Sequence, residues 1–380
     1  MYFLELGGED DAFAAHEAHS AAAGVELVAP GLALADTVSP KRVRGLAYTH
    51  RASELLGRTG ADIESARLLL EAAALDREGS VAVRATDCKG SADIDTARVE
   101  RILGQVLVDR GFTVDLEAPN HVLRAAFAAG EVATTGGDLL EPVNSDADAI
   151  RAESEAATRR AEPEAATTSG DRGSVCALGW LAAESVRDFG SRRPTEKPFF
   201  QPGSMDPLLA RAIANVAGAR PGATVLDPMC GTGGVLVEAG LVGADVVGTD
   251  AQAKMVRGAR ENLAHFLAAE PRDEPGTPAD IQPGEFALSL ADATALPLAD
   301  DAADVVVFDA PYGRQSKIAS HRLEDLVGGA LAEARRVADR AVVVADRSWA
   351  AEARAVGWEL EAAFERRVHR SLTRHVLVLS

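Results

Sequence analysis

A short turn after one apolar stretch carries side chains that could hold a flat ring bearing an amine. Asp304 and the apolar stretch 305–308 are followed by Asp309, Ala310, Pro311 and Tyr312. A nucleobase amine is a weak nucleophile because its lone pair is delocalised into the ring, so a site must accept its hydrogens. Asp309 and the backbone carbonyl of Ala310 could accept them. Pro311 would fix the turn, and Tyr312 would offer a ring for stacking. An ordinary turn at the end of a strand is the alternative interpretation.

Three further acids and a glycine-rich turn lie earlier in the chain. Asp227 precedes Gly231 and Gly233, in a turn of the kind that lets a ligand approach the backbone at the start of a helix. Asp250 ends the next apolar stretch, where an acid can accept both hydroxyls of a ribose. Asp292 follows a third apolar stretch, and its carboxylate could accept from the amino group of an adenine.

The combination of these acids helps to choose between two cofactors. Dinucleotide enzymes share the glycines and the ribose-binding acid, so these features alone do not decide. The carboxylate of Asp227 would repel a pyrophosphate, whereas it could hold a cationic amino group. An acid for an ammonium group, one for a ribose and one for an adenine together describe S-adenosyl-L-methionine, and this chemistry needs no metal. Each acid taken alone is better explained as a cap or a solvent-facing carboxylate.

The elements that would position these residues lie in the last part of the chain. From residue 204 onward, apolar stretches alternate with helical segments, which is the pattern of a doubly wound parallel α/β sheet. Ligands of such sheets bind outside the carboxyl ends of the strands. We expect strands at 224–226, 245–249, 286–290 and 304–308, and a final hairpin of 358–368 with 374–379.

The preceding part of the chain predicts smaller units. We expect a small α/β unit over residues 1–78, with a helix near 51–57, and a second unit over 79–137. The segment 138–175 is acidic and has no apolar period, which predicts a linker or a mobile loop. The last domain is expected to cover 176–380.

Composition limits the class of protein. A chain of 380 residues is long enough for two or three domains. It shows neither a long apolar run nor a signal peptide, and its three widely spaced cysteines favour a reducing cytoplasm.

The charge is unusual, with a formal net value of −19 and only five lysines. Such a surface is typical of proteins that stay soluble in molar salt, where the Debye length is about 3 Å. We therefore interpret the acidity as that of a halophilic cytoplasm, although an acidic protein with no nucleic-acid partner is the alternative.

The order of these acids, glycines and the final turn resembles that of class I methyltransferases that modify exocyclic amines of bases. Residues 199–205, Phe-Phe-Gln-Pro-Gly-Ser-Met, look like a segment of one branch, the archaeal tRNA (guanine-10-N2)-methyltransferase family. Residues 80–136 resemble the THUMP domain, an RNA-binding module that in its family grips the acceptor end of tRNA. The resemblance implies a ferredoxin-like unit over 1–78, a THUMP domain over 79–137 and a seven-stranded methyltransferase sheet in the last domain.

The activity that this resemblance implies is methyl transfer from S-adenosyl-L-methionine to the N2 amine of guanine at position 10 of tRNA, once or twice. The flipped guanine would stack on Tyr312 while Asp309 and the carbonyl of Ala310 orient its amine. One departure is that the family turn normally has a second proline where this chain has Ala310. The resemblance to eukaryotic relatives also suggests a small activating subunit as a partner in addition to tRNA.

Two basic clusters follow the turn and the last apolar stretches. Our hypothesis is that they contact tRNA phosphates, because the arginine fork matches phosphate geometry. The alternative is that they pair with neighbouring acids. The residues considered are Arg314, Lys317, Arg366, Arg367 and Arg370, with Arg374 in the same stretch as the last three.

Two other functions stay open. DNA adenine N6-methyltransferases use a similar turn, normally with Asn in first place, but the RNA-type module at 80–136 is against this reading. A non-catalytic tRNA-binding protein with a lapsed methyltransferase fold would not need the complete set of acids and glycines. Labelled cofactor offered with tRNA and with duplex DNA distinguishes the first alternative, and cofactor binding tests the second.

Overall fold

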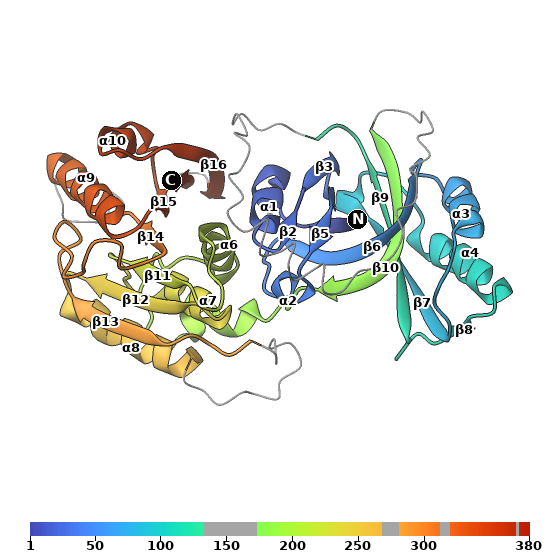
Figure 1. Ribbon diagram of the computed structural model, residues 1–380, viewed down its shortest axis with the longest axis horizontal. Coiled ribbons are helices and arrows are strands. Elements are labelled where there is room, and N and C mark those ends of the chain that lie inside the picture. The colour runs from blue at the N-terminus through green and yellow to red at the C-terminus, as the bar shows by residue number, and fades with distance from the viewer. Residues whose placement is uncertain (133–172, 268–280, 312–319, 370–371) are drawn as a thin grey trace. The chain divides into compact units, whose positions relative to one another are not determined.

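The computed structural model describes residues 1–132, 173–267, 281–311, 320–369 and 372–380. These residues fall into two compact units (Figure 1). The described residues before Val186 form the first unit, and those from Val186 to Ser380 form the second. Nearly all of the stretch that we expected to be a linker, 138–175, lies outside the described residues.

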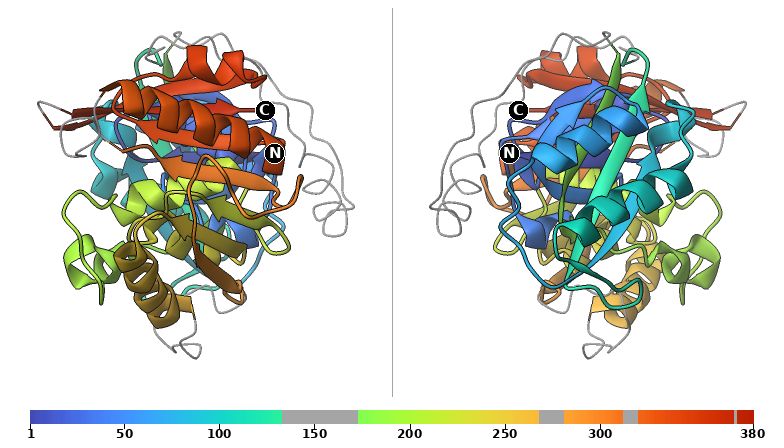
Figure 2. Two further views of the ribbon diagram at one scale, coloured as in Figure 1. Left: turned by 90° about the vertical axis from the view of Figure 1, so that its left-hand side faces the viewer. Right: turned by 90° about the vertical axis from the view of Figure 1, so that its right-hand side faces the viewer.

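The first unit is built on one eight-stranded sheet with the strand order β3-β4-β1-β6-β10-β9-β7-β8. Helices α3 and α4 cover one face of it (Figure 2, right), and their apolar side chains form a core with Trp180. The strands of the unit are β1 (Tyr2–Leu6), β2 (Ala22–Ala23), β3 (Glu26–Ala29), β4 (Leu32–Ala35), β5 (Thr37–Val38), β6 (Thr49–Thr59), β7 (Ser80–Asp87), β8 (Thr113–Val114), β9 (His121–Ala129) and β10 (Ser174–Glu184). The helices are α1 (Asp11–Ala18), α2 (Pro40–Val43), α3 (Ile63–Ala72), η1 (Cys88–Gly90) and α4 (Thr96–Asp109).

Strand β6 replaces the helix that we expected near 51–57, so that prediction is wrong. The local sequence Arg-Ala-Ser-Glu-Leu-Leu contains good helix formers. However, β6 pairs with β1 on one side and with β10 on the other, and Ala52 and Ser53 are fully buried. Pairing on both edges satisfies the backbone and buries the strand, which outweighs a weak local preference for helix.

Strand β10 also moves the domain boundary that we expected at residue 176. It lies between β6 and β9 in the sheet of the first unit, so the expected division between units at that residue is wrong. Cys176, Leu178 and Trp180 on this strand are buried, and they belong to the core under α3 and α4. Strands β6 and β9 are therefore joined through β10 into one sheet, and the segments 1–78 and 79–137 share it.

The second unit contains a seven-stranded sheet with the order β13-β12-β11-β14-β15-β17-β16. The pairs among β11 to β15 are parallel, and β17 is antiparallel to both β15 and β16. The predicted doubly wound sheet and its final hairpin are therefore confirmed. The strands are β11 (Thr224–Asp227), β12 (Asp245–Asp250), β13 (Phe286–Leu290), β14 (Val305–Asp309), β15 (Ala341–Ala345), β16 (Leu360–His369) and β17 (Leu372–Leu379).

Helices cover both faces of this sheet. The core on one face joins Val306 and Phe308 of β14 to apolar residues of α9, which lies apart from α8 (Figure 2, left). Helix α7 packs against both α6 and α8, and all three helices pack against strands of the sheet. The helical elements are η2 (Phe189–Arg192), η3 (Pro194–Glu196), α6 (Pro207–Ala217), α7 (Gly234–Leu241), α8 (Ala253–Leu267), α9 (Ser320–Val337) and α10 (Ala350–Ala355).

Candidate active site

The predicted acids gather at one edge of the second sheet. Asp250, Asp227 and Asp309 are the last residues of β12, β11 and β14, which are neighbours in the sheet. Because these strands are parallel, their carboxyl ends meet at the same edge. Asp292 follows the end of β13, the next strand outward, by two residues.

The turn between β11 and α7 needs glycine at two places. Gly231 and Gly233 have positive φ angles of 51° and 74°, a region that other residues rarely adopt. Gly233 is also the N-cap of α7 and carries no capping side chain. Asp250 fixes this turn, because its Oδ2 accepts from Gly231 N at 3.1 Å while its Oδ1 accepts from Gln252 N at 2.8 Å.

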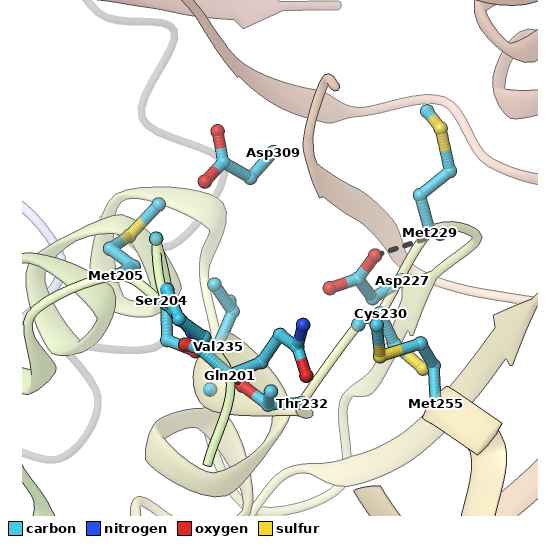
Figure 3. A pocket seen from close by; sticks show the side chains of 14 residues that line it. Gln201, Ser204, Met205, Asp227, Met229, Cys230, Thr232, Val235, Met255 and Asp309 are labelled. Carbon is cyan, nitrogen blue, oxygen red and sulfur yellow. Dashed lines mark hydrogen bonds between the residues drawn. The ribbon is translucent and has the colours of Figure 1, made fainter. Parts of the chain in front are cut away.

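A cavity of about 190 Å³ lies against the turn (Figure 3). Figure 3 shows Asp227 and Asp309 on different sides of it, with Gln201, Ser204 and Met205 along another. Asp250 and Asp292 are not among its lining residues. The lining consists of Gln201, Pro202, Gly203, Ser204, Met205, Asp227, Met229, Cys230, Gly231, Thr232, Gly234, Val235, Met255 and Asp309.

Asp227 is a buried carboxyl group that is suited to binding a cation. Burial raises its pKa well above the usual value, and the negative charges of Asp309 and Asp250 act in the same direction. The hydrogen bond from Met229 N to Oδ1, 3.0 Å long, lowers the pKa but does not outweigh burial. A bound ammonium group would neutralise the ionised form, so the residues present fit the amino group of S-adenosyl-L-methionine.

Asp292 differs from Asp227 in its exposure and in its hydrogen bonds. Its side chain is exposed, and its Oδ1 accepts from both Thr294 N (2.9 Å) and Thr294 Oγ1 (2.8 Å). These two hydrogen bonds lower the pKa of Asp292. The carboxylate therefore closes its own turn, which agrees with the capping alternative, and its second oxygen makes neither of these bonds.

Asp309 lies beside an arginine that sequence reasoning had placed in an RNA-binding cluster. Arg374 Nη2 is 3.9 Å from Asp309 Oδ2, and Arg374 is buried. It reaches this place from β17, which is separated from β14 only by β15. The next residue, Ala310, is buried and donates its N–H to Val344 O at 2.8 Å, which fixes the start of the turn.

The remaining predicted residues are divided between described and undescribed parts. Pro311 is half-buried directly after Ala310, whereas Tyr312 lies outside the described residues. Arg366 and Arg367 are on β16, half-buried and exposed respectively. The other three predicted RNA contacts, Arg314, Lys317 and Arg370, lie outside the described residues.

One wall of the cavity is held by a residue that sequence reasoning missed. Asn262 on α8 accepts from Phe199 N at 2.9 Å and donates to Phe199 O at 3.0 Å. Its Nδ2 also donates to Thr232 O in the glycine turn at 2.8 Å. The Phe199 ring lies on Gly258, one helical turn earlier, where a Cβ would lie only 2.0 Å from the ring. The sequence signal that could have identified this contact was the spacing of Gly258 and Asn262, four residues apart on the buried face of α8.

Two absences can be stated for the described part of the chain. It contains no group of three or more acidic, histidine or cysteine side chains arranged to hold a metal ion. None of its helices has the length and apolar character that crossing a bilayer requires.

Comparisons with known proteins show the family to which the chain is similar. Residues 194–376 match the family described as UPF0020, RMKL-like, methyltransferase domain. The tRNA (guanine(10)-N2)-dimethyltransferase of Methanothermobacter thermautotrophicus is 32% identical over 343 residues, which are 88% of this chain and 83% of that protein. The enzyme of the same name from Pyrococcus abyssi is 29% identical over 51% of this chain and 55% of its own length. The structure of TrmN from Thermus thermophilus matches with a TM-score of 0.45 and 22% identity over 100% of this chain and 99% of its own.

The strand order, the glycine turn and the family match define an S-adenosyl-L-methionine-dependent methyltransferase of class I. Within that class, the chain belongs to the family of the tRNA (guanine(10)-N2)-dimethyltransferases.

Proposed function

We propose that this enzyme transfers methyl groups from S-adenosyl-L-methionine to the N2 amine of guanine at position 10 of tRNA in the cytoplasm. The observation that carries the proposal is the presence of two acids, Asp227 and Asp309, in the lining of one cavity. The first suits the amino group of the methyl donor, and the second suits the hydrogens of an acceptor amine. The relative from Methanothermobacter thermautotrophicus, whose name states this reaction, supports the choice of substrate.

The cofactor supplies an activated methyl group on a sulfonium, and the chain's residues bind and orient the reactants. Asp227 would hold the amino group, and Asp250 would contact the ribose while it keeps the glycine turn closed. Asp292 is proposed for the adenine amino group, through the carboxylate oxygen that Thr294 does not use. A bound adenosine would lie along Gly231 and Gly233, where side chains are absent.

Asp309 and the carbonyl of Ala310 would accept the two hydrogens of the guanine amine and point its lone pair at the methyl group. The nitrogen that gains a methyl group must lose one proton, and the Asp309 carboxylate would take it. The ion pair with Arg374 holds the Asp309 carboxylate in place. Tyr312 would stack on the base that has been flipped from its helix. The structure supports a fixed start of this turn without a second proline, because Ala310 is buried and bonded to Val344.

The first unit is proposed to bind tRNA, with residues 1–78 as the ferredoxin-like part and 79–137 as the THUMP part. Arg366 and Arg367 of the second unit are proposed to contact tRNA phosphates, together with Arg314, Lys317 and Arg370. Replacing Arg366 and Arg367 together by Ser should weaken tRNA binding. A variant that binds tRNA like the original chain would remove this pair from the interface. A small activating subunit remains part of the proposal and would reveal itself as a co-purifying partner that raises the rate.

The decisive test uses tRNA transcripts that differ in one functional group. A transcript with guanine at position 10 should accept one or two methyl groups, measured by mass spectrometry of its nucleosides. A transcript with inosine there should accept none, because inosine lacks the N2 amine. Duplex DNA tests the adenine alternative in the same assay. Methylation of the inosine transcript at an equal rate, or of DNA alone, would contradict the proposal.

Variants then locate the chemistry. Asp309→Ala should abolish transfer and leave cofactor binding near normal. Asp346→Ala is a matched control, since Asp346 is an exposed acid directly after β15, the strand beside β14. Asp346→Ala should keep the original rate, and retained turnover in Asp309→Ala would refute the role of Asp309.

A further inference from the structure

A group of buried cations lies next to the amino end of α7. Arg192, Lys197 and Arg211 are 3%, 6% and 3% exposed. The neighbouring acids are Glu238 on α7, which is 1% exposed, and the half-buried Asp188. The charge of Asp206 also acts on Lys197, but Asp206 is exposed and makes no ion pair with it. Burying a charge without a direct partner is costly, so the way in which each of the three cations is paired matters.

The two arginines use the available carboxylates. Arg192 Nε lies 2.7 Å from Glu238 Oε1, and its Nη1 lies 2.7 Å from Asp188 Oδ2. Arg211 Nη2 lies 2.8 Å from Glu238 Oε2. Lys197 is different, because its ammonium makes no hydrogen bond or ion pair with any residue that the structure describes. Among the described residues, Lys197 is thus the cation of the group that has no direct partner.

The ammonium of Lys197 lies beside the first residue of α7, which lines the cofactor cavity, although Lys197 itself is not a lining residue. A Cβ placed on Gly234 would lie 3.3 Å from Lys197 Nζ. Gly234 is the first residue of α7, and both Gly234 and Val235 line the cavity. The N-cap, Gly233, is a glycine and offers no side chain to the first N–H groups of this helix. Uncapped amides beside a buried ammonium form a site for an anion.

We propose that Lys197 and the first amides of α7 bind the carboxylate of the methionine part of S-adenosyl-L-methionine. This inference rests on the proposed function of the cavity. It gives the amino acid part of the cofactor two oppositely charged partners, because Asp227 lines the same cavity and takes the ammonium group. The zwitterion then satisfies both a buried carboxyl group and a buried ammonium group.

The electrostatics of Lys197 agree with this role. Burial lowers its pKa, and the charge of Arg192 acts in the same direction, against the opposing effects of Glu238 and Asp206. A bound carboxylate would favour the charged ammonium. If Lys197 served only as a distant partner of Glu238, its replacement would change stability without changing which ligands bind.

The test compares two ligands that differ in the carboxylate alone. S-adenosylmethionine and decarboxylated S-adenosylmethionine share the adenosine, the sulfonium and the amino group. Calorimetry on the full chain should show that the first binds about tenfold to hundredfold more tightly, the range expected for a charge-assisted hydrogen bond. Lys197→Met should bind the decarboxylated compound as the original chain does and lose most of the preference for the carboxylate.

A second lysine provides the control. Lys254 contacts the same wall, where its Nζ donates to Gln201 Oε1 at 3.3 Å and lies 5.7 Å from the Phe199 ring centre. Lys254→Met removes a similar charge near the cavity and should keep the preference for the carboxylate. If Lys197→Met keeps that preference, or if the original chain shows none, the inference is wrong while the cofactor assignment stands. If the original chain binds neither compound, the proposed function itself fails.

A measurement on the unchanged protein covers the case in which the variant does not fold. The sequence has only five lysines, so a chain labelled with 13C at the lysine ε-carbon gives few signals. One of them should shift when S-adenosylmethionine is added and should not shift with the decarboxylated compound. No such selective shift would overturn the inference.

Discussion

The wall of the cofactor cavity depends on a single buried amide, so we expect Asn262→Ala to loosen it. Asn262 is 0% exposed and makes three hydrogen bonds, two with the backbone of Phe199 and one with Thr232 O. The change leaves the N–H and the C=O of Phe199 and one carbonyl of the glycine turn without this partner. We expect the segment from Phe199 to Met205 to detach from α8 more often than in the original chain.

The magnitude follows from the number of bonds. A typical intramolecular hydrogen bond contributes about 0.5–1.5 kcal/mol to stability. Three bonds therefore give a loss of about 1.5–4.5 kcal/mol in the free energy of unfolding of the second unit. For a unit of this size each kcal/mol lowers the melting temperature by roughly 2–4 °C, so a decrease of roughly 3–18 °C is expected.

The assay is thermal unfolding combined with hydrogen exchange at the Phe199 amide. Asn120→Ala is the control, because Asn120 also bonds to a backbone N–H, that of Ser80, but is exposed and lies in the first unit. The control should leave exchange at Phe199 unchanged. Asn262→Ala should accelerate that exchange and weaken cofactor binding. If the melting temperature falls while Phe199 exchanges at its original rate, the reasoning that the amide holds this wall is refuted.

Three further predictions concern the same site. Ligand-free Asp227→Asn should melt at a higher temperature than the original chain near neutral pH but should lose cofactor binding. Because the pKa of Asp227 is raised in the folded state, its stabilising contribution is present below its unfolded pKa and is lost as pH rises through the folded pKa. The difference in melting temperature should therefore vanish in acid, and a pH-independent difference would contradict the assignment. Gly258→Ala should destabilise the second unit by about 1–3 kcal/mol, because the new Cβ would lie 2.0 Å from the Phe199 ring. Urea unfolding measures this loss, and unchanged stability would mean that the ring moves aside freely. Arg374→Gln should slow methyl transfer by about tenfold to hundredfold in single-turnover kinetics, because the arginine contacts Asp309. The cofactor dissociation constant should stay unchanged, because Arg374 is not among the residues that line the cavity. A change in cofactor affinity alone would contradict this role.

The central part of the second unit could be predicted from sequence because local signals and fold agree there. Val305–Asp309 is an unbroken apolar run ending in an acid, and such a run has one favourable place, the interior of a parallel sheet. The turn at Gly231 and Gly233 could be predicted equally well, since the positive φ angles that it requires exclude most other residues.

Other residues could not be predicted because their neighbours are distant in sequence. Arg374 stands in a basic stretch that was interpreted as an RNA contact, whereas the sheet order brings it to Asp309, 65 residues earlier. Strand β6 has the local preference of a helix, and only its two partner strands decide otherwise. The role of Asn262 depends on Phe199, 63 residues earlier in the chain.

The position of β10 has a consequence for the order in which the chain folds during synthesis. This strand is the last element of the first unit, yet it lies in the middle of the sheet, between β6 and β9. Until Glu184 has been made and has left the ribosome, β6 and β9 each expose an unpaired edge. The chain up to Glu184 is nearly half of the whole, so the first sheet closes only after synthesis of the second unit has begun. A truncated chain that ends before Ser174 and is released from the ribosome should therefore need protection from aggregation, and a released chain that ends a few residues after Glu184 should not.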